Sequence, residues 1–542
     1  MTDRPFAVTL DVGSSLANKT GAWRTERPVY RDLMPPCNDA CPAGENVQGW
    51  MHYVQERDYE RAWRQLMADN PFPAIMGRVC YHPCQTACNR VQLDQEVGIN
   101  AVERFLGDEA IRQGWTVPVT APPSGRRVLV VGAGPSGLSA AYQLRLRGHQ
   151  VVVRDGEERA GGMMRHGIPA YRLARDVLDA EIDRIAAMGV RLELGSPVSD
   201  LDAALGDEGF DAVFLAIGAQ LSKRAYIPAG ESARILDALS VLHDTAAGTP
   251  PQIGRRVVVY GGGNTAIDAA RTARRLGATD ALIVYRRTRD RMPAHDSEVV
   301  EAEEEGIRLR WLSTIAGADA GSITVERMEL DETGFPQPTG ELEELDADAV
   351  VLAIGQDVDR SLVEDVDGIE VEDGVIQVGP DMMTGRPGIF AGGDMVPAER
   401  TVTTAIGHGK QAARNIDAYL RGTRHEPPPR PDLAGFDLLN TWYFPEAEGA
   451  ERPRLDPDRR VRTFEEVVGG LDEQSALDEA RRCLSCGNCF ECDNCYGMCP
   501  DNAIIKLGPG ERYVIDLDYC KGCGICAAEC PAGAILMVPE ET

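Results

Sequence analysis

The sequence predicts a multidomain protein with an α-helical N-terminal domain, an α/β core and a small α+β domain at the C-terminal end. Its 542 residues are enough for three or four domains of roughly 150 residues each. Between residues 128 and 354, short apolar runs rich in β-branched residues alternate with helical patterns, as in a parallel α/β sheet. The 15 cysteines fall into two separate groups, five in residues 37–88 and ten in residues 483–530.

The composition excludes two classes of partner. The chain is 43% hydrophobic and 26% charged, which is ordinary for a globular protein, but its net charge is −29. Nucleic acids and anionic membranes both require a basic surface, so neither is expected to bind. No apolar run reaches the 18 or so residues of a membrane helix, and the opening MTDRPFAVTLDVGSS has no secretory pattern. Together with cysteines at metal-ligand spacings, these features predict a cytoplasmic protein.

Two proline-rich segments divide the chain. PVTAPPSG (118–125) separates the first cysteine region from the core, and HEPPPRPD (425–432) separates the core from the C-terminal part. Both are typical of semi-rigid linkers. Aromatic and aliphatic residues recur at helical spacing between residues 50 and 66, so this stretch is expected to form amphipathic helices with a buried face.

The first glycine-rich unit, VLVVGAGPSGLSAAYQLRLRGHQVVVRD, has the G-x-G-x-x-G pattern between a strand and a helix. The first glycine makes the tight turn, the second lets a pyrophosphate approach the backbone, and the third lets the helix pack on the strand. An aspartate ends the next strand, where its carboxylate can accept a hydrogen bond from a ribose hydroxyl. The residues predicted to bind this dinucleotide are Gly132, Gly134, Pro135, Ser136, Gly137 and Asp155.

The second unit, VVVYGGGNTAIDAARTARRLGA, has the related pattern G-x-G-x-x-A in the same context. The strand that follows ends in two arginines where an NAD site would place an acid, and guanidinium groups there suit the 2′-phosphate of NADPH. NADPH is therefore favoured over NADH, with a solvated arginine pair as the alternative. The residues predicted to bind this nucleotide are Gly261, Gly263, Asn264, Thr265, Ala266, Arg286 and Arg287.

A third motif, GIFAGGDMVPAERTVTTAIGHGKQAARNI, places Asp394 after a strand and two glycines, with a helix opening near Thr403. Here the chain resembles the two-dinucleotide-binding flavoproteins. The resemblance implies that the aspartate binds the ribitol or pyrophosphate region of FAD, and that the NADPH domain is inserted into the FAD domain. The core has no Cys-x-x-C, so a thioredoxin-reductase-like dithiol is excluded. Further FAD-site candidates are Gly162, Gly355 and Gly393.

The C-terminal cysteines form two runs of the pattern C-x₂-C-x₂-C-x₃-C-P. This is the bacterial two-cluster ferredoxin pattern, in which the fourth cysteine of each run binds the other cluster, and a zinc ribbon is the alternative. One [4Fe–4S] cluster is expected on Cys489, Cys492, Cys495 and Cys530. The other is expected on Cys520, Cys523, Cys526 and Cys499.

Residues 37–425 resemble the small subunit of NADPH-dependent glutamate synthase. They also resemble the N-terminal half of dihydropyrimidine dehydrogenase and the large subunit of NADH-dependent ferredoxin:NADP oxidoreductase. The similarity rests on RHGIPAYRL (165–173), GGGNTAID (261–268), YRRTRDRMPA (285–294) and Cys41-Pro42. It implies two [4Fe–4S] clusters in the helical N-terminal domain. The usual R-C-x-x-C-G upstream of the first C-x₃-C-P is missing, and RDLMPP stands there instead.

The missing ligands have a candidate replacement in RRCLSCG (481–487), whose two cysteines are surplus to the ferredoxin pattern. By the family's ligand set, one cluster takes three cysteines and a glutamate, Cys41, Cys80, Cys84 and Glu103. The other then takes Cys37, Cys88, Cys483 and Cys486, which predicts contact between the two ends of the chain. Four clusters account for all 15 cysteines. The alternative is one N-terminal cluster, with Cys483 and Cys486 free.

The resemblance implies five regions, written here as expectations. They are a helical [4Fe–4S] domain (1–124), an FAD domain (125–225 with 350–425), an NAD(P)H domain (226–349), a linker (426–480) and a ferredoxin-like domain (481–542). FAD is expected to link the hydride of NAD(P)H, a two-electron donor, to one-electron clusters. Hydride transfer needs no protein acid or base, so no catalytic residue is predicted. The eight histidines show no metal spacing.

The predicted function is electron transfer within a hetero-oligomer of redox subunits. The C-terminal module resembles the ferredoxin-like subunit of 2-oxoacid:ferredoxin oxidoreductases, which suggests a thiamine-diphosphate 2-oxoacid oxidoreductase as partner. The alternatives are a glutamate synthase small subunit, a stand-alone NADPH:ferredoxin oxidoreductase, and a redox sensor or assembly protein whose clusters are structural.

Overall fold

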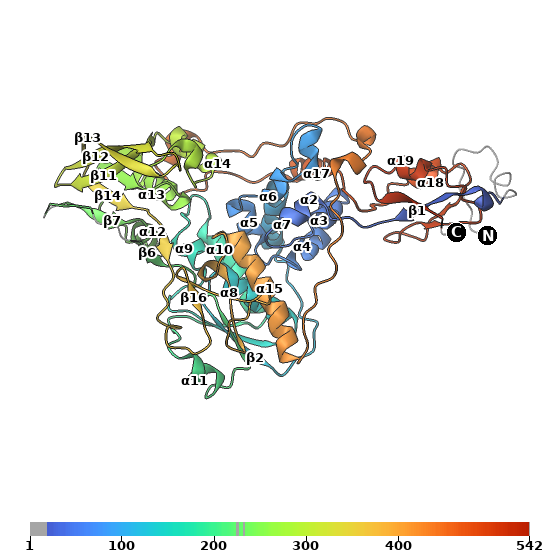
Figure 1. The fold of residues 1–542 in the computed structure, drawn as a ribbon, viewed down its shortest axis with the longest axis horizontal. Helices are drawn as coiled ribbons and strands as arrows, with labels where there is room; N and C mark the ends of the chain where they lie inside the picture. The colour runs from blue at the N-terminus through green and yellow to red at the C-terminus, as the bar shows by residue number, and fades with distance from the viewer. Residues whose placement is uncertain (1–18, 224–226, 231–232, 541–542) are drawn as a thin grey trace.

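A computed structural model describes residues 19–223, 227–230 and 233–540 of the chain. It confirms the predicted fold class, with a helical domain in the middle of an elongated molecule, two α/β domains to one side and a small cysteine-rich domain at the opposite end (Figure 1). The opening MTDRPFAVTLDVGSS and the expected domain junction at 225–226 lie outside the described residues. The described helices are all too short or too polar to span a lipid bilayer.

The helical domain is built from helices of 4 to 15 residues, three of which end one or two residues before a cysteine. Prolines at the first turn start three of them, where a missing N–H costs nothing, and Asn46 and Asp58 cap two others by accepting from Gly49 N and Arg61 N. The core between them holds the expected aromatic face, with Trp50 fully buried. The helices are α2 (Pro36–Ala40), α3 (Val47–Gln55), α4 (Tyr59–Met67), α5 (Pro73–Val79), α6 (Pro83–Thr86) and α7 (Ile99–Gln113).

The first α/β domain has a five-stranded parallel sheet in the order β18-β5-β2-β3-β4. α8 follows β2, and the long α15 packs beside α8 (Figure 1). The strands are β2 (Arg127–Val131), β3 (Gln150–Arg154), β4 (Arg191–Glu193), β5 (Ala212–Leu215) and β18 (Ile389–Ala391). The helices are α8 (Pro135–Leu146), α9 (Met163–His166), α10 (Arg175–Ala187), α11 (Leu201–Leu205) and α15 (Val402–Leu420). Short pairs are formed by β6 (Leu221–Ser222) with β15 (Gln356–Asp357), and β16 (Val371–Glu372) with β17 (Val375–Ile376).

The second α/β domain has a parallel sheet in the order β10-β9-β8-β14-β7 and a separate antiparallel sheet, β11-β12-β13. The parallel strands are β7 (Ile235–Asp237), β8 (Arg256–Tyr260), β9 (Asp280–Val284), β10 (Arg308–Arg310) and β14 (Ala349–Leu352). The antiparallel strands are β11 (Ser313–Ala318), β12 (Ser322–Leu330) and β13 (Pro336–Asp346). The helices are α12 (Ala238–Ala246), α13 (Asn264–Arg275) and α14 (Asp296–Glu304).

The position of β14 differs from the prediction that the chain re-enters the FAD domain at residue 350. It pairs with β8 and β7, so it belongs to the second α/β domain and the chain returns to the first domain only after it. The apolar run at 350–354 marks a strand, but apolarity does not tell which of two similar sheets the strand joins.

The C-terminal domain contains a strand from the other end of the chain. β1 (Glu26–Tyr30) pairs antiparallel with β21 (Ile535–Pro539), so the expected domain 1–124 is divided between two structural units. Figure 1 shows β1 extending from the helical domain to α18 and α19. The other elements are α18 (Asn494–Met498), α19 (Ile525–Ala528), β19 (Ile504–Ile505) and β20 (Val514–Ile515).

Residues 426–480 do more than link two domains. α17 (Glu473–Arg481) packs on α3 and α7, and Ala480 is fully buried in the core of the helical domain. The same stretch holds α16 (Pro457–Arg460) and two short 3₁₀ helices, η5 (Phe436–Leu438) and η6 (Thr441–Tyr443). This packing brings the following segment, with its first two cysteines, back to the helical domain.

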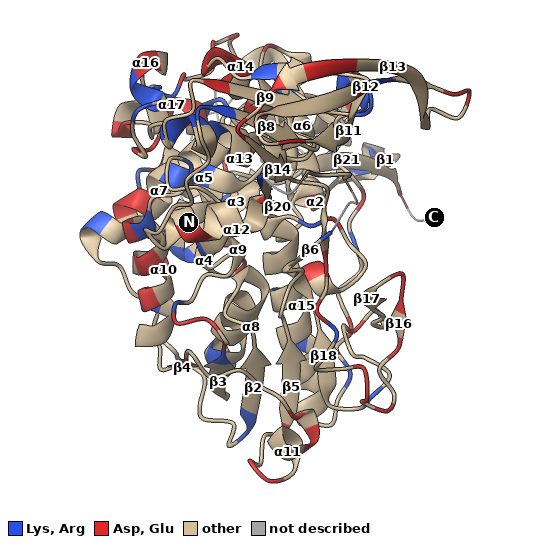
Figure 2. Cartoon of the chain, turned by 90° about the vertical axis from the view of Figure 1, so that its left-hand side faces the viewer, with Lys and Arg blue, Asp and Glu red and all other residues tan. Residues whose placement is uncertain are grey.

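Acidic residues are spread widely along the chain. Figure 2 shows them on α10, α11, β13 and β16, which belong to both α/β domains. Arginines balance some of them, for example Arg154 between Glu193 and Glu208. The net charge of −29 is thus a property of the whole surface rather than of one acidic segment.

Candidate functional site

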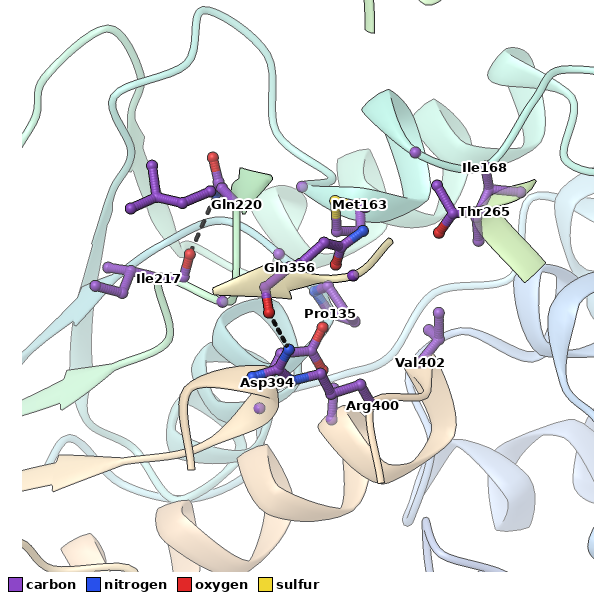
Figure 3. A pocket seen from close by; sticks show the side chains of 18 of the residues that line it. Pro135, Met163, Ile168, Ile217, Gln220, Thr265, Gln356, Asp394, Arg400 and Val402 are labelled. Atoms are coloured by element: carbon purple, nitrogen blue, oxygen red, sulfur yellow. Dashed lines mark hydrogen bonds between the residues drawn. The ribbon is translucent and has the colours of Figure 1, made fainter. Parts of the chain in front are cut away.

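A cavity of about 1140 Å³ lies between the two α/β domains and is lined by both glycine-rich turns (Figure 3). Most of the predicted dinucleotide-site residues line it. They are Gly132, Gly134, Pro135, Ser136, Asp155, Gly162, Gly261, Gly263, Asn264, Thr265, Arg286, Arg287, Gly355, Gly393 and Asp394. The two predicted nucleotide sites therefore share one cavity, in which two bound nucleotides can contact each other.

The first turn has the features of a pyrophosphate cradle. Gly132 has φ of 110°, and a Cβ there would lie 2.3 Å from the carbonyl oxygen of Ala216. A Cβ on Gly162 would lie 2.8 Å from Cα of Gly134, so these two glycines keep the approach open. α8 begins without a side-chain cap, and the Ser136 hydroxyl is buried with no hydrogen-bond partner among the described residues. Uncapped N–H groups and an unsatisfied hydroxyl fit a bound phosphate.

Two aspartates face the same cavity in different surroundings. Asp155 accepts hydrogen bonds from the backbone N–H of Ala133 at 2.6 Å and of Glu157 at 2.8 Å, which fixes its carboxylate against the glycine turn. Burial raises the pKa of Asp394 to about 6. Figure 3 shows Asp394 beside Arg400, whose guanidinium donates to the carbonyl oxygen of Gln356 at 2.8 Å.

The second turn leaves room for a nucleotide phosphate. A Cβ added at Gly263 would meet no atom within 4 Å, so this turn faces open space. Arg286 and Arg287 line the cavity, and neither guanidinium has an ion pair or hydrogen bond with any other described residue. Two unpaired guanidinium groups at the wall of a nucleotide cavity fit an anionic ligand group.

Three predicted residues do not line the cavity. Gly137 and Ala266 are the third positions of their motifs and serve close helix packing, because a Cβ on Gly137 would lie 1.9 Å from the carbonyl oxygen of Gly132. Thr403 is buried and donates its hydroxyl proton to Sγ of Cys80 at 3.1 Å. It thus connects α15 of the first α/β domain to a cysteine of the helical domain.

The cavity and its rim also contain residues that were not among the predicted site residues. Tyr81 stacks on His295 with ring centroids 3.5 Å apart, and its hydroxyl accepts from Asn264 Nδ2 at 2.7 Å. Arg172 pairs with Asp268 at 2.8 Å and with Glu298. Tyr81 follows Cys80 directly, and this adjacency to a predicted ligand is the signal that could have identified it.

The 16 predicted metal-ligating residues form four sets of four. We call them the proximal, bridging, third and fourth groups. The proximal group is Cys41, Cys80, Cys84 and Glu103. The bridging group is Cys37, Cys88, Cys483 and Cys486. The third group is Cys489, Cys492, Cys495 and Cys530, and the fourth group is Cys499, Cys520, Cys523 and Cys526. All 15 cysteines are free thiols in the structure.

The proximal group surrounds the end of α5. Burial raises the pKa of Cys84 well above its ordinary value, and the charges of Cys80 and Cys41 raise it further. Burial also raises the pKa of Glu103, again with a contribution from Cys80. Thiols and a carboxyl that burial keeps protonated become ligands only when a metal displaces their protons, so this environment fits a metal site.

A second buried carboxylate lies beside the proximal group. Asn70 donates through Nδ2 to Glu45 and to Glu103, at 2.9 Å in each case. Burial raises the pKa of Glu45 to about 7. Glu45 was not identified from the sequence, because a lone carboxylate outside any cluster motif carries no signal.

The bridging group joins the two ends of the chain. Its four cysteines line one small apolar cavity together with Val47, Met51 and Ile99. Burial raises the pKa of Cys37, followed by the charges of Cys483, Cys88 and Cys486. The structure thus brings the surplus cysteines of RRCLSCG to the N-terminal cysteines.

Buried charges hold this junction in place. Arg90 pairs with Asp94 at 2.6 Å and donates to the carbonyl oxygen of Arg482 at 2.8 Å. Arg482 in turn pairs with Asp94 at 3.2 Å and with Glu479 at 3.0 Å. Because Arg482 immediately precedes Cys483, this network positions the bridging group.

The third and fourth groups follow the crossed ferredoxin pattern. The pKa of Cys495 is raised to about 11 by burial, and then by the charges of Cys489, Cys492 and Cys530. The fourth group lines one small cavity of its own. N–H groups donate to the sulfurs of the two crossed cysteines, from Ala503 to Cys499 and from Ala534 to Cys530, both at 3.3 Å.

The spacing of the sulfurs disfavours the zinc ribbon. A tetrahedral zinc ion with Zn–S distances of about 2.3 Å needs sulfurs within about 4 Å of one another. Among the described residues, no three cysteines bring their sulfurs within 4.8 Å of one another. Each set is therefore wider than a single-ion site, as a cluster of several iron atoms requires.

One further group of possible ligands occurs in the described part of the chain. Ligand atoms of Glu157, His166 and His243 lie within 4.8 Å of one another, and the two imidazoles stack with centroids 4.7 Å apart. No sequence spacing marks this group, because His243 comes from α12 and the other two residues come from the first α/β domain.

Three known families match parts of this chain. Residues 126–409 match the family described as "Pyridine nucleotide-disulphide oxidoreductase". Residues 24–115 match "Dihydropyrimidine dehydrogenase domain II, 4Fe-4S cluster", and residues 513–536 match "4Fe-4S binding domain".

Three curated relatives illustrate the setting. The NADP(+)-dependent formate dehydrogenase subunit beta of Moorella thermoacetica is 37% identical, covering 83% of this chain and 70% of that protein. The NADPH-Fe(3+) oxidoreductase subunit beta of Geobacter sulfurreducens is 32% identical, covering 83% and 75%. The glutamate synthase [NADPH] small chain of Azospirillum brasilense is 33% identical, covering 73% and 88%.

Proposed function

Because the chain belongs to the pyridine nucleotide-disulphide oxidoreductase family, we propose that it is the NADPH-linked electron-transfer subunit of a larger redox complex. When bound, FAD supplies the exchange between electron pairs at a nicotinamide and single electrons at iron–sulfur clusters. The observation that carries the proposal is the position of Cys80. The residues on either side of it, Val79 and Tyr81, line the nucleotide cavity. The Thr403 hydroxyl donates a hydrogen bond to the sulfur of Cys80.

The four groups are arranged as a relay from that cavity to the far end of the molecule. Neighbouring groups share short peptides, since Cys37 and Cys41 are four residues apart and Cys486 and Cys489 only three. An extended chain advances at most about 3.6 Å per residue, so these Cα pairs lie within about 14 and 11 Å. Such spacing supports transfer between adjacent clusters without any large movement.

Four [4Fe–4S] clusters are the cofactor content that this geometry supports best. Fifteen cysteines and Glu103 supply the 16 ligands that four clusters need. The alternative is one N-terminal cluster with Cys483 and Cys486 free. It does not explain why the four cysteines of the bridging group line one small apolar cavity.

The two unpaired arginines favour NADPH over NADH. A guanidinium group beside the ribose recognises a 2′-phosphate, which NADH lacks. We expect Arg286→Ala with Arg287→Ala to raise KM for NADPH by at least about 100-fold and to leave KM for NADH within about twofold, because two charge-assisted contacts of roughly 1.5–3 kcal/mol each are lost. Equal losses with both nucleotides would show that the pair does not read the phosphate.

The function itself is tested by anaerobic titration of the purified chain with NADPH. We expect the visible absorbance of the clusters to bleach on the timescale of turnover, with benzyl viologen reduced as a small acceptor. Clusters that stay oxidised while the nucleotide is in excess would instead support a structural or sensing role.

The partner is proposed to be another redox subunit in a reducing, cytoplasmic compartment. The resemblance of the C-terminal module to the ferredoxin-like subunit of 2-oxoacid:ferredoxin oxidoreductases suggests a thiamine-diphosphate 2-oxoacid oxidoreductase. The curated relatives instead include subunits of formate dehydrogenase and glutamate synthase. NADP⁺ reduction by the purified complex with a 2-oxoacid and coenzyme A, or with formate, separates the first two. Glutamine-dependent NADPH oxidation identifies the third, and activity with none of these leaves a stand-alone NADPH:ferredoxin oxidoreductase.

A further inference from the structure

A fixed and exposed tryptophan stands beside the third group. Trp442, in η6, is 88% exposed. The segment that carries it is tied to α19 and the residues after it. Asn440 donates through its backbone N–H to the carbonyl oxygen of Pro531 at 3.2 Å and through Nδ2 to that of Ala528 at 2.8 Å. The Tyr443 hydroxyl donates to Glu529. The backbone that carries the exposed indole is therefore tied to the C-terminal domain on both sides of Trp442.

The same segment borders a shallow hollow that reaches a predicted cluster ligand. Asp437, Leu438, Asn440 and Trp442 line one side, and Ala528 and Cys530 line the other. Tyr443 lies close enough to the exposed Cys492 for that thiol to raise the tyrosine's pKa, after the larger effects of Glu529 and burial. A protein seated here would thus lie against Cys530, a member of the third group.

The charges near the hollow are mostly acidic. Residues 431–450 contain four acidic residues and no lysine or arginine. Glu491 and Asp493 flank Cys492, and the nearby Lys506 is already paired with Asp493 at 2.5 Å. An acidic partner would be repelled here, whereas a basic rim would be attracted and oriented.

We propose that this surface, residues 436–443 with α19, docks a redox partner that has a basic rim and an apolar pocket for Trp442. We call it the Trp442 face. A rigid tryptophan contributes large contact area at little cost in conformational entropy, and such residues dominate binding at the centre of interfaces. The proposal rests on the proposed function, since it names the exit through which electrons reach the partner.

The test uses the full chain with its cofactors and two acceptors, cytochrome c as a basic one-electron protein and benzyl viologen as a small molecule. We expect Trp442→Ala to raise KM for cytochrome c at least about tenfold, as for the loss of a binding hot spot, with the benzyl viologen rate unchanged. The matched controls are Trp23→Ala, a 68% exposed tryptophan elsewhere on the C-terminal domain, and Phe335→Ala, a 52% exposed aromatic residue of the second α/β domain. Neither should change KM for cytochrome c.

Several results would overturn the proposal. These are an unchanged KM in Trp442→Ala, a larger effect of Trp23→Ala, absence of saturable cytochrome c reduction, or a lower KM for an acidic two-cluster ferredoxin than for cytochrome c. If NADPH fails to reduce even benzyl viologen, the proposed function is wrong. The docking assay is then repeated with protein whose clusters are first reduced by dithionite and then freed of excess dithionite, which would otherwise reduce cytochrome c directly. Saturable cytochrome c reduction that depends on Trp442 would still support the face.

Discussion

The two cysteine regions of this protein are assembled in opposite ways. The third and fourth groups come from one continuous stretch, residues 489–530, and lie within one small domain. The proximal and bridging groups draw on residues from 37 to 486, and the bridging group forms only because α17 packs on α3 and α7. A compact set depends on local spacing, whereas a distributed set depends on the fold of the whole chain.

This difference has a consequence for the energetics of cofactor binding. Metal binding to a site contributes free energy only to the structure that assembles the ligands. A cluster in the bridging group would therefore fasten the C-terminal segment to the helical domain, in addition to carrying electrons. Clusters in the third and fourth groups would stabilise their own domain and β1, which pairs with it.

The largest expected effect comes from removing the two distant ligands of the bridging group. We expect Cys483→Ser with Cys486→Ser to lower iron from about 16 to about 12 atoms per FAD, because one [4Fe–4S] cluster loses half its ligands. Iron and acid-labile sulfide, measured against FAD, check this. Arg481→Gln serves as the control, because its side chain is 56% exposed on the same helix end. A wild-type protein near 12 iron atoms per FAD would contradict the four-cluster proposal.

The same double variant also separates the two regions functionally. NADPH should still reduce the proximal cluster, but electrons should no longer reach the third and fourth groups at the wild-type rate. Freeze-quenched EPR after NADPH addition measures this. Unimpaired reduction of the C-terminal clusters would mean that the bridging group does not lie on the electron path.

A smaller effect is expected at the proximal group, where two buried glutamates are candidates for the fourth cluster ligand. We expect Glu103→Leu to lose or convert the proximal cluster, and Glu45→Leu to retain it, because Glu103 is the predicted ligand and both carboxylates share Asn70. Iron content and EPR line shape distinguish an intact cluster from a three-iron product. The reverse outcome would assign the ligand to Glu45 and leave Glu103 as its hydrogen-bonded neighbour.

The two regions also show what a sequence can and cannot reveal. The glycine turns and the ferredoxin runs could be located because each is a local pattern with a fixed spacing. The surplus of Cys483 and Cys486 was visible by counting, but the burial of Ala480 that positions them was not. β14 was recognised as a strand and placed in the wrong sheet, because pairing between similar parallel strands is decided by the fold.

Glu45 and β1 illustrate a second limit. A lone carboxylate in a turn has no motif, and its importance appears only when burial raises its pKa to about 7 beside the cysteines. The strand ERPVY is short and half-exposed, and its partner lies about 500 residues away, so local propensity carries no information on the pairing.

The smallest expected effect concerns one hydrogen bond that this strand delivers to the third group. The Tyr30 hydroxyl lies 3.3 Å from Sγ of Cys495. A hydrogen bond to a ligand sulfur stabilises the more negative, reduced cluster, so Tyr30→Phe should lower that cluster's potential. About 1 kcal/mol for the bond corresponds to a shift on the order of 40 mV for one electron. Redox titration followed by EPR measures it, with Tyr513→Phe as the control, since that hydroxyl donates to Asp493 rather than to sulfur. Equal shifts in both variants would mean that general polarity, and not the bond from β1, sets the potential, and the N-terminal strand would then serve only to complete the sheet.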